Sequence, residues 1–181
     1  MKKIMMTIAA AFVATAMSAQ GYIGGNVGFT TSKANYDGAK STTRFTIAPE
    51  IGYNLNEDWA IGAALGFTSN KHGDADAVTE FTVAPYARYT FAKLEKVNFF
   101  LDGQVSYATV KDNYDKFGVH IIPGVAVNLN EKVSFVAKLG GEFGGLGWTQ
   151  YKDKGSDVKT NTFGFDLQSL AGLSFGLYYN F

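Results

Sequence analysis

Most ionisable side chains in the regular segments of this sequence share one face. Where polar and apolar residues alternate, the charges fall on the polar side: Arg44, Glu50, Glu80, Arg88, Asp102, His120, Lys138, Glu142 and Asp166. Alternation of this kind places successive side chains on opposite faces of a β-strand. The charges therefore belong to one face of a sheet, opposite an apolar face.

The charges form two predicted layers when residues are counted from the short connections between the segments. One layer holds Glu50, Arg88, Asp102 and Lys138, and a higher one holds Arg44, Glu80, His120 and Glu142. Each layer is electrically balanced, the higher one when His120 is protonated. Buried charges without partners are costly, so we expect close ion pairs, above all between Arg88 and Asp102 on neighbouring segments.

Two kinds of chemistry suit such layers. An ion-pair network would fill the inside of a small barrel, because eight strands leave room for side chains and little else. The alternative is a narrow gated pore, in which inward-facing glycines leave space for solutes. We favour the ion-pair network and keep the pore as the alternative.

Eight alternating segments would position these charges. They cover residues 21–31, 43–53, 59–68, 79–91, 97–109, 117–129, 133–143 and 163–181. Short connections at residues 54–58, 92–96 and 130–132 alternate with longer polar ones at residues 32–42, 69–78, 110–116 and 144–162. This order predicts an antiparallel up-and-down meander with short turns at one end and long loops at the other, as in transmembrane barrels. Pro49, Pro85 and Pro123 lie within strands and lack an N–H donor, so we expect a β-bulge at each.

The apolar face decides between a soluble barrel and a membrane barrel. The Phe, Leu, Ile and Val of eight strands cannot share an eight-stranded lumen with the charges, so the apolar face must point outward to lipid. Closing the sheet then satisfies every backbone group, as hydrocarbon requires. Aromatic residues gather at both ends of this face, as two interfacial girdles would: Tyr53, Trp59, Tyr89, Phe91, Tyr179 and Phe181, and Phe29, Phe45, Phe67, Phe81, Tyr107, Phe117 and Phe143. The sequence predicts an all-β, eight-stranded antiparallel transmembrane β-barrel, with a β-sandwich as the alternative.

The N-terminus has the pattern of a secretory signal peptide. Two lysines follow Met1, residues 4–13 are apolar, and small residues predominate at 14–20. The apolar run is too short to span a bilayer. Cleavage is expected after Ser18 or Ala19, so that residues 1–19 are removed and residues 20–181 form the barrel domain.

The amino-acid composition limits the classes of molecule that the protein is expected to bind. The 16 basic and 16 acidic residues cancel, so nothing favours nucleic acid. The 21 glycines and 15% aromatic residues suit an all-β chain with crowded backbones. There is no cysteine, hence no disulfide framework and no thiolate metal site. We expect no metal and no cofactor.

With these features the chain resembles the small outer-membrane barrels of the OmpA/OmpX type, and more broadly the outer membrane protein β-barrel domain (porin-like) family of Gram-negative bacteria. Ser174, Gly176, Tyr179 and Phe181 are similar to the C-terminal strand signal that the barrel-assembly machinery reads in that family; they also form the girdle end of the last strand. The resemblance implies a bacterial outer-membrane location, with membrane lipid and the assembly machinery as partners. We expect a monomer.

The resemblance also raises enzymatic and binding roles. Lipid A deacylases and palmitoyltransferases share the architecture, but a deacylase needs a His beside a Ser on its outer surface. His120 points inward, and His72 lies in a predicted loop, so we expect no catalysis. Trp148 and Tyr151, in the predicted loop 144–162, would suit a surface ligand, or would pack on the barrel rim or among head groups. We predict a structural or surface-interaction (adhesion-like) role, with a low-conductance diffusion channel as the alternative.

Overall fold

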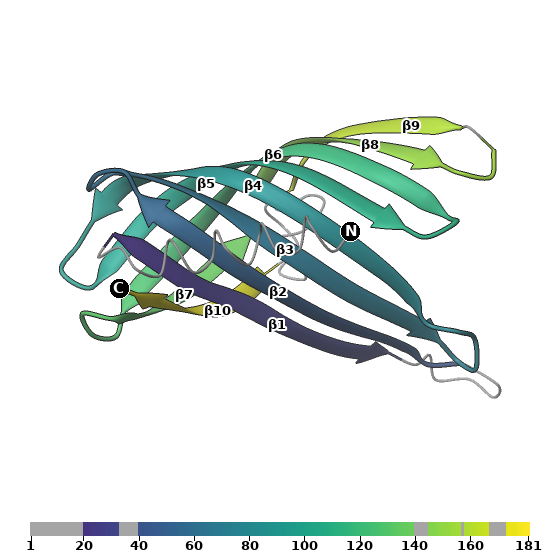
Figure 1. Ribbon diagram of the computed structural model, residues 1–181, viewed down its shortest axis with the longest axis horizontal. Helices are drawn as coiled ribbons and strands as arrows, with labels where there is room; N and C mark the ends of the chain where they lie inside the picture. The colour runs from purple at the N-terminus through teal and green to yellow at the C-terminus, as the bar shows by residue number, and fades with distance from the viewer. Residues whose placement is uncertain (1–19, 33–39, 140–144, 157, 167–172) are drawn as a thin grey trace, which may run out of the picture.

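The computed structural model of the protein is a barrel of antiparallel strands (Figure 1). It describes residues 20–32, 40–139, 145–156, 158–166 and 173–181. These residues form the strands β1 (Gly21–Ser32), β2 (Thr42–Asn54), β3 (Trp59–His72), β4 (Val78–Lys93), β5 (Val97–Val110), β6 (Tyr114–Asn128), β7 (Val133–Leu139), β8 (Gly145–Asp153), β9 (Lys159–Asp166) and β10 (Leu173–Asn180). Among the described residues, no helix is long and apolar enough to cross a membrane.

The ten segments make eight barrel strands. From β1 to β7 each strand pairs with the next, and β10 closes the ring by pairing with both β7 and β1. β7 and β8 occupy successive stretches along β6, because β7 pairs with Gly124–Asn128 and β8 with Tyr114–Ile121. In the same way β9 and β10 are successive stretches of the last barrel strand: β9 pairs with β8, and β10 pairs with β7. The predicted eight-stranded meander is confirmed, and the β-sandwich is excluded.

The prediction of a long loop at residues 144–162 is wrong. Most of that stretch forms β8 and the start of β9, which make a hairpin beyond the end of β7. Towards the tip of this hairpin both faces of the strands carry polar residues, such as Thr149 and Gln150 in β8 and Asn161 and Thr162 in β9. Apolar alternation therefore fades, and a strand resembles a loop in the sequence. The same effect shortens the predicted loop at 110–116, because β6 begins at Tyr114.

The prediction of a β-bulge is wrong at Pro49 and Pro85. Pro49 lies opposite Gly25, Pro85 opposite Ala63 and Pro123 opposite Leu101, each in unbroken register with one neighbouring strand. Towards the other neighbour, the ladder skips Pro49 and Pro85 without changing register. Each strand of a barrel pairs with two neighbours. A proline lacks the N–H that would donate to one of them, so it loses one backbone hydrogen bond on that side, and the strand does not need to insert an extra residue. The pairing shifts between Thr90 and Ala92, and again beside Pro123, where Ile121 pairs with Leu146 of β8 but Gly124 pairs with Lys138 of β7.

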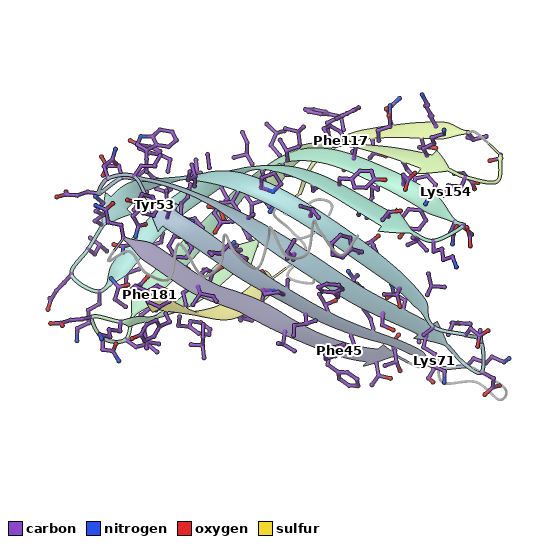
Figure 2. All side chains as sticks on the ribbon, in the orientation of Figure 1. Phe45, Tyr53, Lys71, Phe117, Lys154 and Phe181 are labelled. Atoms are coloured by element: carbon purple, nitrogen blue, oxygen red, sulfur yellow. The ribbon has the colours of Figure 1, made fainter. Side chains whose placement is uncertain are left out.

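The outer face of the barrel is apolar, as predicted. At the short-turn end Trp59 packs on Tyr89, with ring centroids 4.8 Å apart, and at the opposite end Phe67 packs on Phe81 at 5.1 Å. Figure 2 places Tyr53 and Phe181 near the short turns, Phe45 and Phe117 on the outer surface, and Lys71 and Lys154 at the far tips. The described members of both predicted girdles thus lie at the two ends of the apolar face. Phe143 and the predicted signal peptide, residues 1–19, lie outside the described residues.

Replacing Ile121 with Lys tests which face meets lipid. Ile121 points outward, is 46% exposed, and pairs with Gly103 midway along β5. A lysine at the bilayer midplane costs about 2–4 kcal/mol, so we expect the free energy of unfolding to fall by that amount in urea titrations of the barrel in lipid vesicles. Val158→Lys, at an exposed turn position, is the matched control and should change it little. Equal effects of the two substitutions would place Ile121 in water.

Candidate functional site in the barrel lumen

Arg88 and Asp102 form the centre of the lumen. They are directly opposite each other on β4 and β5. The Arg88 Nε donates to Asp102 Oδ1 at 2.7 Å, and its Nη2 donates to Oδ2 at 2.9 Å. This fork is the strong two-bond geometry of a guanidinium and a carboxylate. Asp102 is 1% exposed, so the pair lies away from solvent.

Lys138 connects this pair to the opposite wall. Its Nζ donates to both carboxylate oxygens of Glu50, at 2.9 and 2.8 Å, and lies 3.2 Å from Asp102 Oδ2. The Tyr178 hydroxyl donates to Glu50 Oε2 at 2.7 Å. Two cations and two carboxylates therefore balance, as a buried group of charges must. All four residues of the lower predicted layer meet here, and they come from β2, β4, β5 and β7.

Four aromatic rings surround the Arg88 guanidinium. Its carbon lies 3.9 Å from the ring centroid of Phe100 and between 5.3 and 5.8 Å from those of Tyr86, Tyr22 and Tyr178. These distances allow attraction between the cation and each ring face. The Tyr22 and Tyr86 hydroxyls share a hydrogen bond of 2.9 Å. We call the charged and aromatic residues together the lumen cluster: Tyr22, Glu50, Tyr86, Arg88, Phe100, Asp102, Lys138 and Tyr178.

Glycines on adjacent strands make room for these rings. Tyr178 lies against Gly24, Tyr22 against Gly52, Tyr86 against Gly62 and Phe100 against Gly124. A Cβ atom at any of these four glycines would overlap the ring beside it. All eight barrel strands consequently contribute either a side chain or a glycine to the lumen cluster. The aromatic members were not singled out from the sequence, although they are bulky residues on a face that otherwise carries small ones.

The higher predicted layer does not form as one network in the part of the chain described. Glu80 accepts from the Tyr114 hydroxyl at 2.6 Å and lies 3.5 Å from Lys116 Nζ. His120 shares a hydrogen bond of 3.1 Å with Thr149. The prediction missed these partners because β6 begins three residues before the predicted strand, which brings Tyr114 and Lys116 onto the inner face.

Arg44 and Glu142 also depart from that prediction. The Arg44 side chain is exposed and, among the described residues, forms no ion pair. The far ends of β1 to β4 diverge from β8 and β9 (Figure 1), and Arg44 lies in this part of β2, opposite Thr30 and Asn70. Glu142 lies outside the described residues, as does the side chain of Asp166.

The residues predicted to bind a surface ligand belong to the β8–β9 hairpin. Trp148 points outward and packs on Phe117, with centroids 6.0 Å apart, and the Tyr151 ring lies tilted against Tyr114, with centroids 4.7 Å apart. Lys154 Nζ bonds the Val110 carbonyl and lies 3.0 Å from Asp115 Oδ1. These contacts attach the hairpin to the β5–β6 turn. Both aromatics are half-buried against the rim of the barrel.

The predicted assembly signal lies along β10. A Cβ at Gly176 would stand 2.6 Å from the Gly25 carbonyl oxygen, so the seam between β10 and β1 requires a glycine there. Tyr179 and Phe181 point outward with ring centroids 5.1 Å apart, and the Phe181 N–H donates to the Gly21 carbonyl at 3.0 Å. Ser174 faces Lys138 across the ladder. These residues have a role in closing the barrel; their recognition by the assembly machinery stays a prediction.

Replacing Arg88 with Ala tests the lumen cluster. The change leaves a buried carboxylate without its main partner, which destabilises proteins by about 3–5 kcal/mol. We expect the urea midpoint and the temperature of unfolding on a semi-native gel to fall accordingly. Arg44→Ala is the matched control and should stay within about 0.5 kcal/mol, as exposed substitutions do. An Arg88→Ala barrel as heat-resistant as the wild type would refute a stabilising network.

The glycine contacts give a second test. In Gly124→Ala, the new methyl group overlaps the Phe100 ring, and overpacking of this kind costs about 1–3 kcal/mol. Gly103→Ala is the control, because Gly103 faces outward and its nearest neighbour lies at an ordinary contact distance of 3.8 Å. We expect urea unfolding to separate the two variants. Equal stability of both would show that Phe100 does not need that glycine.

Comparisons with known proteins agree with this geometry. The family described as "Outer membrane protein beta-barrel domain" matches residues 4–168. Among solved structures, the Neisserial surface protein A (NspA) is similar with a TM-score of 0.51 and 17% identity, covering 91% of this chain and 98% of that one. The outer membrane protein OmpT of Vibrio cholerae matches with a TM-score of 0.35 and 14% identity over 87% of this chain and 53% of that one. No curated protein matches. The family match covers most of the chain and agrees with its eight-stranded fold: this protein belongs to the outer membrane protein β-barrel domain family and lies in the bacterial outer membrane.

Proposed function

We propose that this protein is a non-enzymatic integral barrel with a structural or surface-interaction role. The observation that carries the proposal is the lumen cluster. Its eight side chains come from both sides of the barrel, and each is at most 8% exposed. Packed side chains around Arg88 and Tyr178 would obstruct solutes in the lumen, which supports a role other than transport. Such a barrel acts through its walls and its projecting hairpins rather than by transport.

The surface role is assigned to the β8–β9 hairpin. Its tip carries exposed Ser156, Val158 and Lys159 beyond the aromatic girdle, next to Lys154, which Figure 2 places at the end farthest from the short turns. Because Trp148 and Tyr151 are held against the rim, ligand contacts would come from the tip rather than from these rings. Loop tips on a rigid scaffold are common binding sites. We propose that this tip binds a partner outside the cell.

The absence of catalysis is part of the proposal. Covalent hydrolysis needs a nucleophile, a base and a group that orients the base. His72 Nδ1 is bonded to the Thr42 hydroxyl at 2.8 Å, and His120 faces Thr149 in the lumen. Neither histidine stands beside a serine on the lipid-facing surface, where a lipid substrate would lie. We expect purified protein neither to hydrolyse nor to acylate lipid A.

The remaining partners follow from the fold. We propose that the barrel is a monomer surrounded by outer-membrane lipid, because its apolar outer face suits lipid around its whole circumference. The closing strand β10, with Gly176 and the terminal Phe181, is the segment proposed to engage the assembly machinery.

Single-channel recording separates this role from the alternative, a narrow diffusion channel. We expect wild-type protein in planar bilayers to give no resolvable conductance steps. Glu50→Ala combined with Lys138→Ala removes one buried pair without leaving a single unpaired charge, and should produce small steps if the lumen cluster closes the barrel. Heat-modifiable gel migration of both proteins controls for folding. Steps from the wild type as large as those from the double variant would favour the channel.

A further inference from the structure

A cavity of about 600 Å³ lies beneath the lumen cluster, at the end of the barrel with short turns. Its roof is formed by Arg88 with the rings of Tyr22, Phe100 and Tyr178. Cavities that hold small molecules have volumes of roughly 300–1,000 Å³, so this one has room for a ligand. Short turns face the periplasm in barrels of this kind, so the cavity opens to that side.

The cavity wall carries a ring of carboxamides. Asn54, Asn98, Asn128 and Asn180 line it from the ends of β2, β5, β6 and β10. Each side chain offers both a donor and an acceptor. Ser134 donates to Asn128 Oδ1 at 2.9 Å and accepts from Asn180 Nδ2 at 3.1 Å.

Much of this hydrogen-bonding capacity is available to a ligand. The contacts through Ser134 leave the Asn128 amide nitrogen and the Asn180 amide oxygen available. The carboxamides of Asn54 and Asn98 form no side-chain hydrogen bond with the described residues. Both donors and acceptors therefore line the cavity.

Both cations of the lining are paired with carboxylates. Arg88 in the roof is paired with Asp102, and Lys93 at the rim donates to Asp58 at 2.6 Å and lies 3.9 Å from Glu57. An anionic ligand would have to lose its hydration without finding an unpaired cation among these residues. A neutral ligand with many hydroxyl or amide groups meets no such penalty.

We propose that this cavity binds a neutral saccharide, and that N-acetylated sugars suit it well. The carboxamides match sugar hydroxyl and acetamido groups. A peptide shares the amide chemistry but commonly binds by adding a strand to a free sheet edge. At this end β10 pairs with both β1 and β7, so the described wall offers no such edge. The site is separate from the proposed surface role at the opposite end of the barrel.

Titration with the trisaccharide of N-acetylglucosamine tests this proposal. The refolded barrel is kept in a detergent without a sugar head group, and the asparagine side-chain amides are followed by NMR. We expect saturable shifts of the Asn54 and Asn98 amide signals. Asn98→Leu and Asn54→Leu should each weaken binding about tenfold, because each removes a polar side chain and leaves ligand groups unpaired. Asn70→Leu, an inward position at the opposite end of β3, should bind like the wild type.

Three results would overturn the assignment. They are the absence of any saturable shift in the wild type, unchanged affinity in both Asn54→Leu and Asn98→Leu, and tighter binding of an acidic hexapeptide than of the trisaccharide. Heat-modifiable migration shows whether each variant is folded. The wild-type titration decides the question even if a variant fails to fold.

Discussion

The structure depends on a carboxylate held between two cations. Asp102 is almost fully buried and is charged at a depth where lipid surrounds the barrel, so it requires Arg88 and Lys138 beside it. Lys138 in turn requires Glu50 on the far wall, and Glu50 receives the Tyr178 hydroxyl. Each partner lies on a different strand. The ion pairs of one buried carboxylate therefore connect opposite walls across the lumen. The backbone hydrogen bonds connect only adjacent strands around the circumference.

The glycines of the inner face follow from the same constraint. A lumen of eight strands has little spare volume, so rings that surround a guanidinium must lie flat against the wall. They do so only where the adjacent strand has no side chain, as at Gly52 beneath Tyr22 and Gly124 beneath Phe100. A high glycine content is thus a packing requirement of the lumen. The same ring layer forms the roof of the cavity that opens at the short-turn end.

The sequence predicted the meander, the outward apolar face and the meeting of Arg88 with Asp102. Short turns fix the register of neighbouring strands, so heights counted from them are reliable near that end. The same count is misleading above the membrane, where β6 begins earlier than expected and Lys116, rather than Arg44, lies beside Glu80. The hairpin at Trp148 was missed because alternation disappears where both faces are polar. The contacts of Tyr22 and Phe100 depend on which glycine of the adjacent strand lies beside each ring. The alternation within a single strand does not show how neighbouring strands are aligned, so it could not predict these contacts.

A double-mutant cycle on Lys138 and Glu50 tests the central claim most directly. The free energy of unfolding in urea would be measured for Lys138→Ala, Glu50→Ala and the combined variant in lipid vesicles. If the two side chains connect opposite walls through a buried ion pair, their coupling energy should be about 1.5–3 kcal/mol. A coupling energy near zero, with the two single effects simply adding, would contradict this account of the lumen cluster.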